Sequence, residues 1–287
     1  MRSMNARNGS KLNRLEQLLP EGLLVDAAWM EKKGYYRSLR SQYVAAGWLE
    51  QPVRGVFRRP RGTISWEQVV VSLQMLMGYP VSVGGLTALK LDGYAHYVSQ
   101  RDKSIHLYGD KKLPSWVFKL GLSETFVYHN RLRLLPQVGG PPASLLSLTT
   151  YQLYKDAIPI VDGLRVHSWG HWEWPMVISS PERAILELLD ELPKNETFHM
   201  ADVIMEGLVN LSPHRLQTLL QNTSSIKVKR LFFFFADRHN NRWFKKIKRD
   251  KIDLGKGKRV LTKGGKLDPI YQITVPKDFI KDGVNDF

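Results

Sequence analysis

The sequence of 287 residues predicts an α+β fold, in which an N-terminal winged helix-turn-helix precedes a larger mixed α/β C-terminal domain. Three observations predict it. Three helical patterns follow one another in the first 47 residues, two β-prone runs then flank a turn, and helix and strand patterns alternate in the remainder. Pro60-Arg61-Gly62 is typical of a linker, so we expect one domain over residues 1–62 and a second over residues 63–287.

The N-terminal elements follow in order from leucine spacing and capping residues. Residues 11–19 carry leucines at helical spacing. Asp26 is a helix-capping residue type ahead of a short second helix, which Gly34 ends. The third helix ends at Gly47, and its expected core-facing residues are Leu39, Tyr43 and Ala46. The runs at 48–49 and 56–58 flank a turn that contains Pro52, Arg54 and Gly55, and they predict a two-stranded wing.

The second domain begins with a helical pattern at Trp66 and then alternates. The pair Gly84-Gly85 precedes another helix, and we interpret it as a helix start rather than an anion site. Further elements are expected as strands over 104–109 and 124–129, a hairpin over 162–179, an amphipathic helix after Ser180, and two helices within 198–225.

Positive charge is concentrated at the two ends of the chain. The formal net charge is +15, and residues 1–62 have 12 Lys and Arg against 5 Asp and Glu, a net of +7. Residues 63–224 have a net of −2, whereas residues 225–266 have 15 against 3, a net of +12. Because clustered cations displace counterions from phosphates together, nucleic acid is the expected partner.

Several classes of protein are disfavoured by what the sequence lacks. There are no cysteines, which excludes disulfide scaffolds, thiol catalysis and iron–sulfur clusters, and we expect the chain in the reducing cytoplasm. No apolar run is long enough for a membrane span or a signal peptide, so we expect neither membrane association nor export. The sequence has no recognisable cofactor-binding motif and no Ser-His-Asp order of catalytic residues. We therefore expect that the protein binds no cofactor and is not an enzyme.

Basic and polar residues of the third helix are the candidates for reading DNA bases. With a rotation of 100° per residue, the helix turns a basic and polar face outward. Arginine binds guanine with two hydrogen bonds and serine reaches bases or phosphates, so the base-reading candidates are Arg37, Ser38, Arg40 and Ser41. Backbone contacts are expected from Lys11, Arg14, Tyr36, Arg54, Arg58, Arg59 and Arg61. The alternative, a module that binds protein, is less favoured because a net of +7 exceeds what solubility needs.

The second basic segment, residues 225–266, interleaves aromatic residues with cations. Exposed rings at Phe232, Phe235, Trp243 and Phe244 would stack on bases, but a run of four phenylalanines is more often buried, and we favour burial. The residues proposed as a C-terminal nucleic-acid surface are Lys227, Lys229, Arg230, Arg242, Lys245, Lys246, Lys248, Arg249, Lys256, Lys258 and Arg259.

Two remaining patterns receive a structural interpretation. His167 and His171 have the spacing of helical zinc ligands, but Gly170 and nearby tryptophans favour a hairpin, so we expect no metal site. Four carboxylates lie on the helix after Ser180, and we interpret them as a solvated face: Glu182, Glu187, Asp190 and Glu191.

Several stretches together resemble the AbiEi antitoxin family, over about residues 11 to 277. They include KLNRLEQLLPEG, YVAAGWLEQPVRGVFRRP, VSVGGLTALKLDGYAHY, ISSPERAILELLDELP and IKVKRLFFFFADRHNNRWFKKI. The resemblance implies a type IV antitoxin that represses its own operon by binding inverted repeats in promoter DNA. It also implies a nucleotidyltransferase-like toxin that is opposed without a stable complex. HSWGHWEWP departs from the family pattern and leaves the role of the hairpin open.

Three other mechanisms of antitoxin action stay open. An RNA-binding module would shield the RNA target of the toxin, an enzyme such as a kinase would modify the toxin, and a protein-binding antitoxin would hold it directly. The interleaved aromatics are the feature relevant to the first of these, whereas the absence of a nucleotide or metal motif argues against the second.

Overall fold

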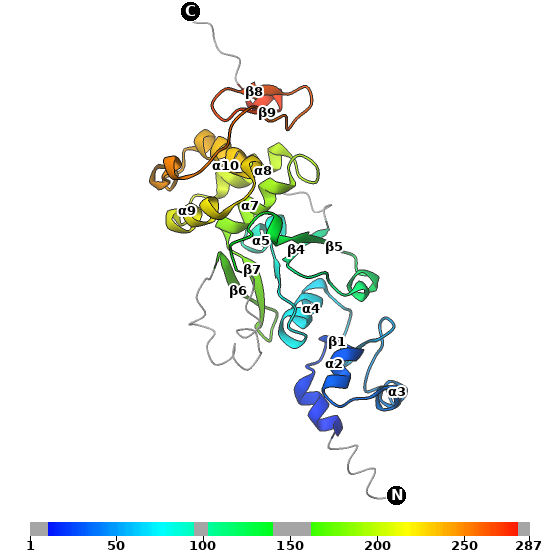
Figure 1. The fold of residues 1–287 in the computed structure, drawn as a ribbon. Coiled ribbons are helices and arrows are strands. Elements are labelled where there is room, and N and C mark those ends of the chain that lie inside the picture. The colour runs from blue at the N-terminus through cyan, green and yellow to red at the C-terminus, as the bar shows by residue number, and fades with distance from the viewer. Residues whose placement is uncertain (1–10, 95–102, 140–161, 281–287) are drawn as a thin grey trace, which may run out of the picture.

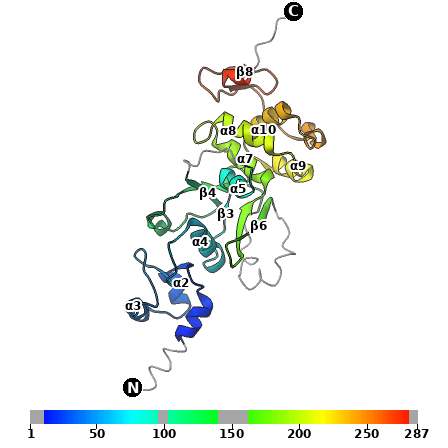
Figure 2. The same ribbon diagram turned by 180° about the vertical axis from the view of Figure 1, so that it is seen from behind.

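The computed structural model describes residues 11–94, 103–139 and 162–280. The molecule is elongated, as Figure 1 shows, with α2 and α3 at one end and β8 and β9 at the other. A mixed sheet and the helices that cover it lie between the two ends, and the view from behind in Figure 2 shows the same arrangement. The fold is the α+β architecture that the sequence predicts.

The N-terminal end is a winged helix-turn-helix. A helix over residues 11–18 is followed by β1 (Leu24–Asp26), α2 (Ala27–Lys32), α3 (Arg37–Ala45) and β2 (Val56–Arg58). The three predicted helices are confirmed, and Asp26 caps α2 because its carboxylate accepts a hydrogen bond from the backbone N–H of Trp29 at 2.8 Å. Gly34 follows α2 with a φ of 89°, a backbone conformation that glycine adopts without strain.

The wing differs from the expectation in its pairing. β2 lies where it was predicted, but its partner is β1, with Leu24 opposite Arg58. The run at 48–49 is not a strand, and only Glu50 bridges to Arg58, through two backbone hydrogen bonds of 2.9 and 3.0 Å. The apolar residues before Asp26 have no alternating pattern of the kind that predicts a strand. The pairing of β1 with β2 could therefore not be predicted from the sequence.

The hydrophobic core of this end continues into the next elements. Helix α4 (Trp66–Val71) begins at Ser65 with a capping box and continues as the π-helical turn η1 (Ser72–Leu76). Leu24, Val70 and Ile178 are wholly buried in one cluster that joins the N-terminal module to one face of the sheet. The boundary near residue 62 stays a prediction, because one core spans it.

The sheet has five strands in the order β5-β4-β3-β7-β6. β3 pairs antiparallel with β4 and parallel with β7, β4 pairs parallel with β5, and β6 and β7 form an antiparallel hairpin. The strands are β3 (Val81–Val83), β4 (Ser104–Gly109), β5 (Thr125–Asn130), β6 (Leu164–Trp169) and β7 (Trp174–Ser179). The predicted strands and the predicted hairpin are confirmed.

A helical layer with a second core covers the other face of the sheet (Figure 1). Its helices are α5 (Gly85–Leu91), α7 (Pro181–Glu191), α8 (Phe198–Gly207), α9 (Pro213–Asn222) and α10 (Ile226–His239). The described residues also form short 3₁₀ turns and a hairpin: η2 (Ser115–Lys119), η3 (Arg131–Arg133), η6 (Phe244–Lys246), η7 (Arg249–Lys251), β8 (Lys266–Asp268), β9 (Ile273–Val275) and η8 (Lys277–Phe279). Phe232, Phe233 and Phe235 are wholly buried at the centre of this layer.

Candidate nucleic-acid interface

The outer face of α3 carries short polar side chains and one free arginine. Tyr43 is buried and anchors the inner face of the helix in the core of the module. The exposed positions of α3 are Arg37, Ser38, Ser41, Gln42 and Ala45. A helix of this size with an exposed polar face fits the major groove of B-DNA, where arginine and glutamine pair with guanine and adenine edges.

A groove of about 510 Å³ lies between α3 and the loop before β2. Arg37 and Ser41 line it from α3, and Gln51 and Arg54 line it from the loop. Within the part of the chain that the structure describes, neither guanidinium has a hydrogen-bond or ion-pair partner. Two unpaired arginines on one groove produce a positive potential that suits phosphate or a guanine edge.

Gln51 also lines this groove, and the sequence interpretation did not name it. Glutamine is a side chain that pairs with adenine. The sequence could have indicated Gln51, because it is a polar residue inside the predicted wing, and a wing is expected to lie near the third helix. The expectation was restricted to arginines and serines, and Gln51 was therefore passed over.

Arg40 does not belong to the outer face of α3. Arg40 is 6% exposed. Its guanidinium donates hydrogen bonds to the carbonyl of Tyr35 at 2.9 Å and to the carboxylate of Glu31 at 3.0 Å. The guanidinium carbon also lies 5.5 Å from the ring centroid of Phe57. We therefore remove Arg40 from the base-reading set. Its guanidinium joins α2, the start of α3 and β2, so its role is to position the helix.

Arg58 is also engaged inside the module. Its side chain is 8% exposed and forms an ion pair with Glu50 at 2.6 Å. It donates a further hydrogen bond to the carbonyl of Gly62 at 2.6 Å. The guanidinium of Arg58 thus joins the wing to the segment that follows the wing. Because it is engaged in these contacts, this guanidinium is not available to bind a phosphate.

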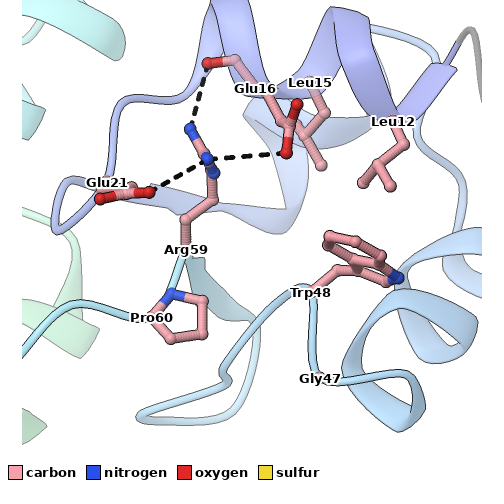
Figure 3. A pocket seen from close by; sticks show the side chains of 8 residues that line it. All are labelled: Leu12, Leu15, Glu16, Glu21, Gly47, Trp48, Arg59 and Pro60. Carbon is pink, nitrogen blue, oxygen red and sulfur yellow. Dashed lines mark hydrogen bonds and ion pairs between the residues drawn. The ribbon is translucent and has the colours of Figure 1, made fainter.

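Arg59 and Arg61 are paired with acids of the first helix and of the turn after it. Figure 3 shows the Arg59 guanidinium between Glu16 and Glu21, at 3.6 and 3.3 Å from their carboxylate oxygens. Arg61 pairs with the second oxygen of Glu21 at 3.1 Å. These ion pairs compete with phosphate, so the wing arginines differ in role from the free Arg54. The pocket of Figure 3, with a volume of about 220 Å³, is lined on its other side by Trp48.

The remaining N-terminal candidates are exposed. Lys11 and Arg14 lie on the outer face of the first helix, and Tyr36, 66% exposed, precedes α3. The Tyr35 hydroxyl donates to the carbonyl of Lys11 at 2.9 Å, which fixes the first helix beside the start of α3. These three side chains are therefore exposed on elements next to α3, and their contact with a DNA backbone stays a prediction.

The C-terminal candidates divide into buried and exposed cations. Lys229 is 6% and Arg230 3% exposed, and burial lowers the pKa of both side chains. Arg230 donates to the carbonyls of Leu254 and Gly257, and Lys227 donates to the carbonyls of Asp190 and Leu192. These three residues have structural roles, so we remove them from the proposed nucleic-acid surface. The exposed candidates are Arg242, Lys245, Lys246, Lys248, Arg249, Lys256, Lys258 and Arg259.

The aromatic residues of this segment are core residues. Phe232 and Phe235 are wholly buried, Trp243 is 3% exposed, and the indole N–H of Trp243 donates to the carbonyl of Leu208 at 2.6 Å. Phe244 is half-buried against the same core. The burial favoured from the sequence is confirmed, and these rings cannot stack on bases.

The carboxylates of α7 do not form the solvated face that was expected. Glu182 is 3% exposed and Glu187 is wholly buried. Glu187 accepts hydrogen bonds from Arg183 at 2.8 Å and from the backbone N–H of Gly85 at 2.9 Å. The expectation was wrong because α7 lies in the middle of the helical layer, where the buried Arg183, the partly exposed Arg215 and a helix start satisfy the acids. Gly84-Gly85 starts α5, as predicted, and its N–H group binds this carboxylate of the protein itself.

A chain of hydrogen bonds at the end of α7 joins Glu191, His129 and His106. Glu191 lies 3.2 Å from Nδ1 of His129, and Nε2 of His129 lies 2.9 Å from Nδ1 of His106. Burial raises the pKa of Glu191, but the hydrogen bonds from His129 and Asn195 and the charges of the two histidines outweigh it and lower the pKa to about 2. The cluster fastens the helix to strands β4 and β5.

The two histidines of the hairpin lie in different parts of it. His167 lies in β6 and His171 at the tip, and burial and Arg165 lower the pKa of His167. Within residues 11–94, 103–139 and 162–280, no group of three or more His, Cys, Asp or Glu side chains is arranged to hold a metal ion. Among the same residues no helix is long and apolar enough to cross a membrane.

Comparisons with known proteins cover almost the whole chain. Residues 102–276 match the model of a family described as a transcriptional regulator, AbiEi antitoxin, of a type IV toxin–antitoxin system. Residues 8–100 match the model of the AbiEi antitoxin N-terminal domain. The crystal structure of the RV2827C protein from Mycobacterium tuberculosis is similar, with a TM-score of 0.53 and 16% identity over 91% of this chain and 88% of that chain. That likeness shows the fold alone, and a comparison with curated proteins gave no match.

Proposed function

The chain belongs to the AbiEi antitoxin family of transcriptional regulators, and we propose that it represses its own operon by binding inverted repeats in the promoter. The observation that carries this proposal is the groove beside α3, where Arg37 and Arg54 have no partner in the described part of the chain. We also propose that the chain acts in the cytoplasm, where promoter DNA lies.

In the proposed complex α3 lies in the major groove. Arg37, Ser38 and Ser41 read base edges, and Gln51 and Arg54 contact the adjoining bases or phosphates from the loop before β2. The exposed side chains that contact the backbone on either side are Lys11, Arg14 and Tyr36. Arg40 acts through α3, because its hydrogen bonds fix the angle of the helix.

A fluorescence-anisotropy titration of the full-length protein tests this proposal. The probes are the promoter duplex that lies upstream of the gene and a scrambled duplex of equal length. We expect promoter-selective binding that the Arg37→Ala, Arg54→Ala double variant weakens by at least tenfold, since each bidentate contact contributes roughly 1–3 kcal/mol. Arg133→Ala is the matched control, because Arg133 is an exposed arginine of η3 in the body of the molecule. Equal affinity for both duplexes would overturn the proposal.

We further propose that the chain counters a nucleotidyltransferase-like toxin without forming a stable complex with it. The support is family membership in a type IV system. The test is growth rescue by co-expression with the toxin encoded beside it, combined with size-exclusion chromatography of the two purified proteins. Rescue with separate elution supports the proposal, whereas co-elution would replace it with direct toxin binding, and no rescue would refute antitoxin action.

A further inference from the structure

Gln42 is exposed on α3 and lies outside the set of residues proposed to read bases. At a rotation of about 100° per residue, it lies about 140° around the helix from Arg37. The other exposed positions of α3 fall between these two: Ser38, Ser41 and Ala45. Arg37 and Gln42 therefore form the two edges of the outer face of the helix.

The two edges have different electrostatic surroundings. Arg37 lines the groove of about 510 Å³ beside α3, and Arg54 lines the same groove from the loop before β2. Gln42 is not among the described residues that line it. The neighbours of Gln42 on the helix surface carry no charge: Ser38, Leu39, Ala45 and Ala46. Positive potential is thus concentrated at the edge of Arg37, whereas the edge of Gln42 presents a neutral amide.

The amide of Gln42 suits a base better than a phosphate. Within the part of the chain that the structure describes, this amide has no hydrogen-bond partner. Attraction to phosphates comes mainly from the charge of lysine and arginine, which glutamine lacks. In the major groove, however, a glutamine amide forms two hydrogen bonds with the N6 and N7 atoms of adenine. Gln42 therefore has the chemistry of a residue that selects adenine.

The side chains between the two edges are short. Ser38, Ser41 and Ala45 extend no further than a hydroxyl or a methyl group, so the backbone of α3 can approach the base edges closely. Ala45 lies three residues after Gln42, and side chains at this spacing are neighbours on a helix surface. An alanine methyl contacts the methyl group of thymine, which is the partner of adenine. Gln42 and Ala45 together therefore suit an A·T pair.

We infer that Gln42 determines the specificity of α3 for an A·T pair, with Ala45 against the thymine methyl, while Arg37 selects a guanine at a separate position. This inference rests on the proposed promoter binding. Along the helix axis Arg37 and Gln42 are about 7.5 Å apart, which is close to two base-pair steps of about 3.4 Å. The bound half-site therefore contains a guanine and, roughly two base pairs away, an A·T pair.

Selection from a library of randomised DNA duplexes with the full-length protein tests this assignment. The bound duplexes are sequenced, and the base preference at each position is expressed as a ratio of affinities. We expect the wild type to enrich a motif that contains the guanine and the A·T pair. Gln42→Ala lowers the preference for adenine about tenfold and keeps the preference for guanine, whereas Arg37→Ala does the reverse. Gln42→Arg changes the preferred base at the same position from adenine to guanine, which a merely structural role for Gln42 would not produce.

The matched control is Gln221→Ala, which removes an exposed glutamine of α9 and leaves the motif unchanged. An identical motif for the wild type, Gln42→Ala and Gln42→Arg would overturn the assignment and leave promoter binding in place. An equal loss of affinity for every sequence in Gln42→Ala would also overturn it, because Gln42 would then support the helix rather than read a base. If the wild type enriches no motif, promoter binding itself fails, and the specificity assigned to Gln42 fails with it.

Discussion

The guanidinium of Arg61 lies over the indole of Trp172, with its carbon 5.7 Å from the ring centroid. Arg61 follows the wing and also pairs with Glu21, whereas Trp172 lies at the tip of the β6–β7 hairpin and is 59% exposed. The hairpin whose role the sequence left open thus contacts the segment between the N-terminal module and the rest of the chain.

Replacement of Trp172 by alanine is expected to loosen that segment. A cation–π contact at an exposed site contributes about 0.5–1 kcal/mol, so the bond between Arg61 and Gly62 becomes more accessible to trypsin and is cleaved several-fold faster. The preceding Arg59-Pro60 bond resists trypsin and does not confuse the result. Trp172→Phe keeps a ring and restores slow cleavage, and Phe118→Ala, which removes another exposed ring, is the control. Equal cleavage rates for all four proteins would contradict the role of this contact.

Arg37 and Arg40 are expected to differ in what their loss changes. Arg40→Ala removes charged hydrogen bonds to the carbonyl of Tyr35 and to the carboxylate of Glu31, so we expect a loss of roughly 2–3 kcal/mol in the free energy of unfolding, measured by urea titration. Arg37→Ala removes an exposed side chain without a partner in the described residues, and its stability stays within about 0.5 kcal/mol of the wild type. We expect Arg37→Ala to weaken promoter binding although the fold stays intact. An unfolding curve of Arg40→Ala that overlays the wild type would refute the positioning role.

Glu187 is expected to be among the most sensitive positions of the C-terminal layer. Glu187→Ala leaves the guanidinium of Arg183, which is wholly buried, without its carboxylate, and breaking one side of a buried ion pair costs about 3–5 kcal/mol. Thermal unfolding monitored by circular dichroism measures the effect. Glu206→Ala, which removes an exposed carboxylate from α8, serves as the comparison and leaves the midpoint nearly unchanged. Similar midpoints for the two variants would show that the buried pair does not support the fold.

The chain of Glu191, His129 and His106 predicts a dependence of stability on acid. The folded pKa of Glu191 is about 2, below its ordinary value of 4.5, so its ionised form stabilises the fold above pH 4.5. As the pH falls from about 4.5 to about 2, the carboxylate becomes protonated and the stabilisation, on the order of 3 kcal/mol, is lost.

Urea titrations of the wild type and of Glu191→Gln at pH 7 and at pH 3 check this dependence. At pH 7 we expect the wild type to have a larger free energy of unfolding than Glu191→Gln. This difference in free energy is expected to be smaller at pH 3, because part of the Glu191 carboxylate is then protonated and no longer stabilises the fold more than the amide does. Glu206→Gln, on an exposed carboxylate of α8, controls for the general effect of acid. A difference that stays constant between the two pH values would exclude the coupling.

Local patterns in the sequence predicted most of the elements. Asp26, Gly34 and Gly47 bounded α2 and α3, because capping and helix termination depend on residues within a few positions of one another. The alternating strands and the Ser180-Pro181 helix start were found for the same reason. The pairing of β1 with β2 was not found, because Leu24 and Arg58 meet only after the chain between them has folded.

The candidate site was predicted in its location and only partly in its residues. Arg37 and Arg54 are exposed as expected, whereas Arg40 carries the same side chain and is buried. Residue type alone does not distinguish them, since an arginine is buried where carbonyls and a carboxylate surround its guanidinium. The carbonyls belong to Ala27 and Tyr35 and the carboxylate to Glu31, and the ring of Phe57 in β2 packs against the same guanidinium through tertiary packing.

What the sequence by itself determined is the set of helices and strands, the concentration of cations at both ends and the burial of the phenylalanine run, because each follows from neighbours along the chain or from hydrophobicity. The tertiary structure alone decided which cations are free. Arg59 is held by Glu16 and Glu21, Glu187 is held by Arg183, and the C-terminal lysines lie far from α3. Partners of this kind are brought together by packing of distant segments, and whether a charge is paired or exposed depends on those partners.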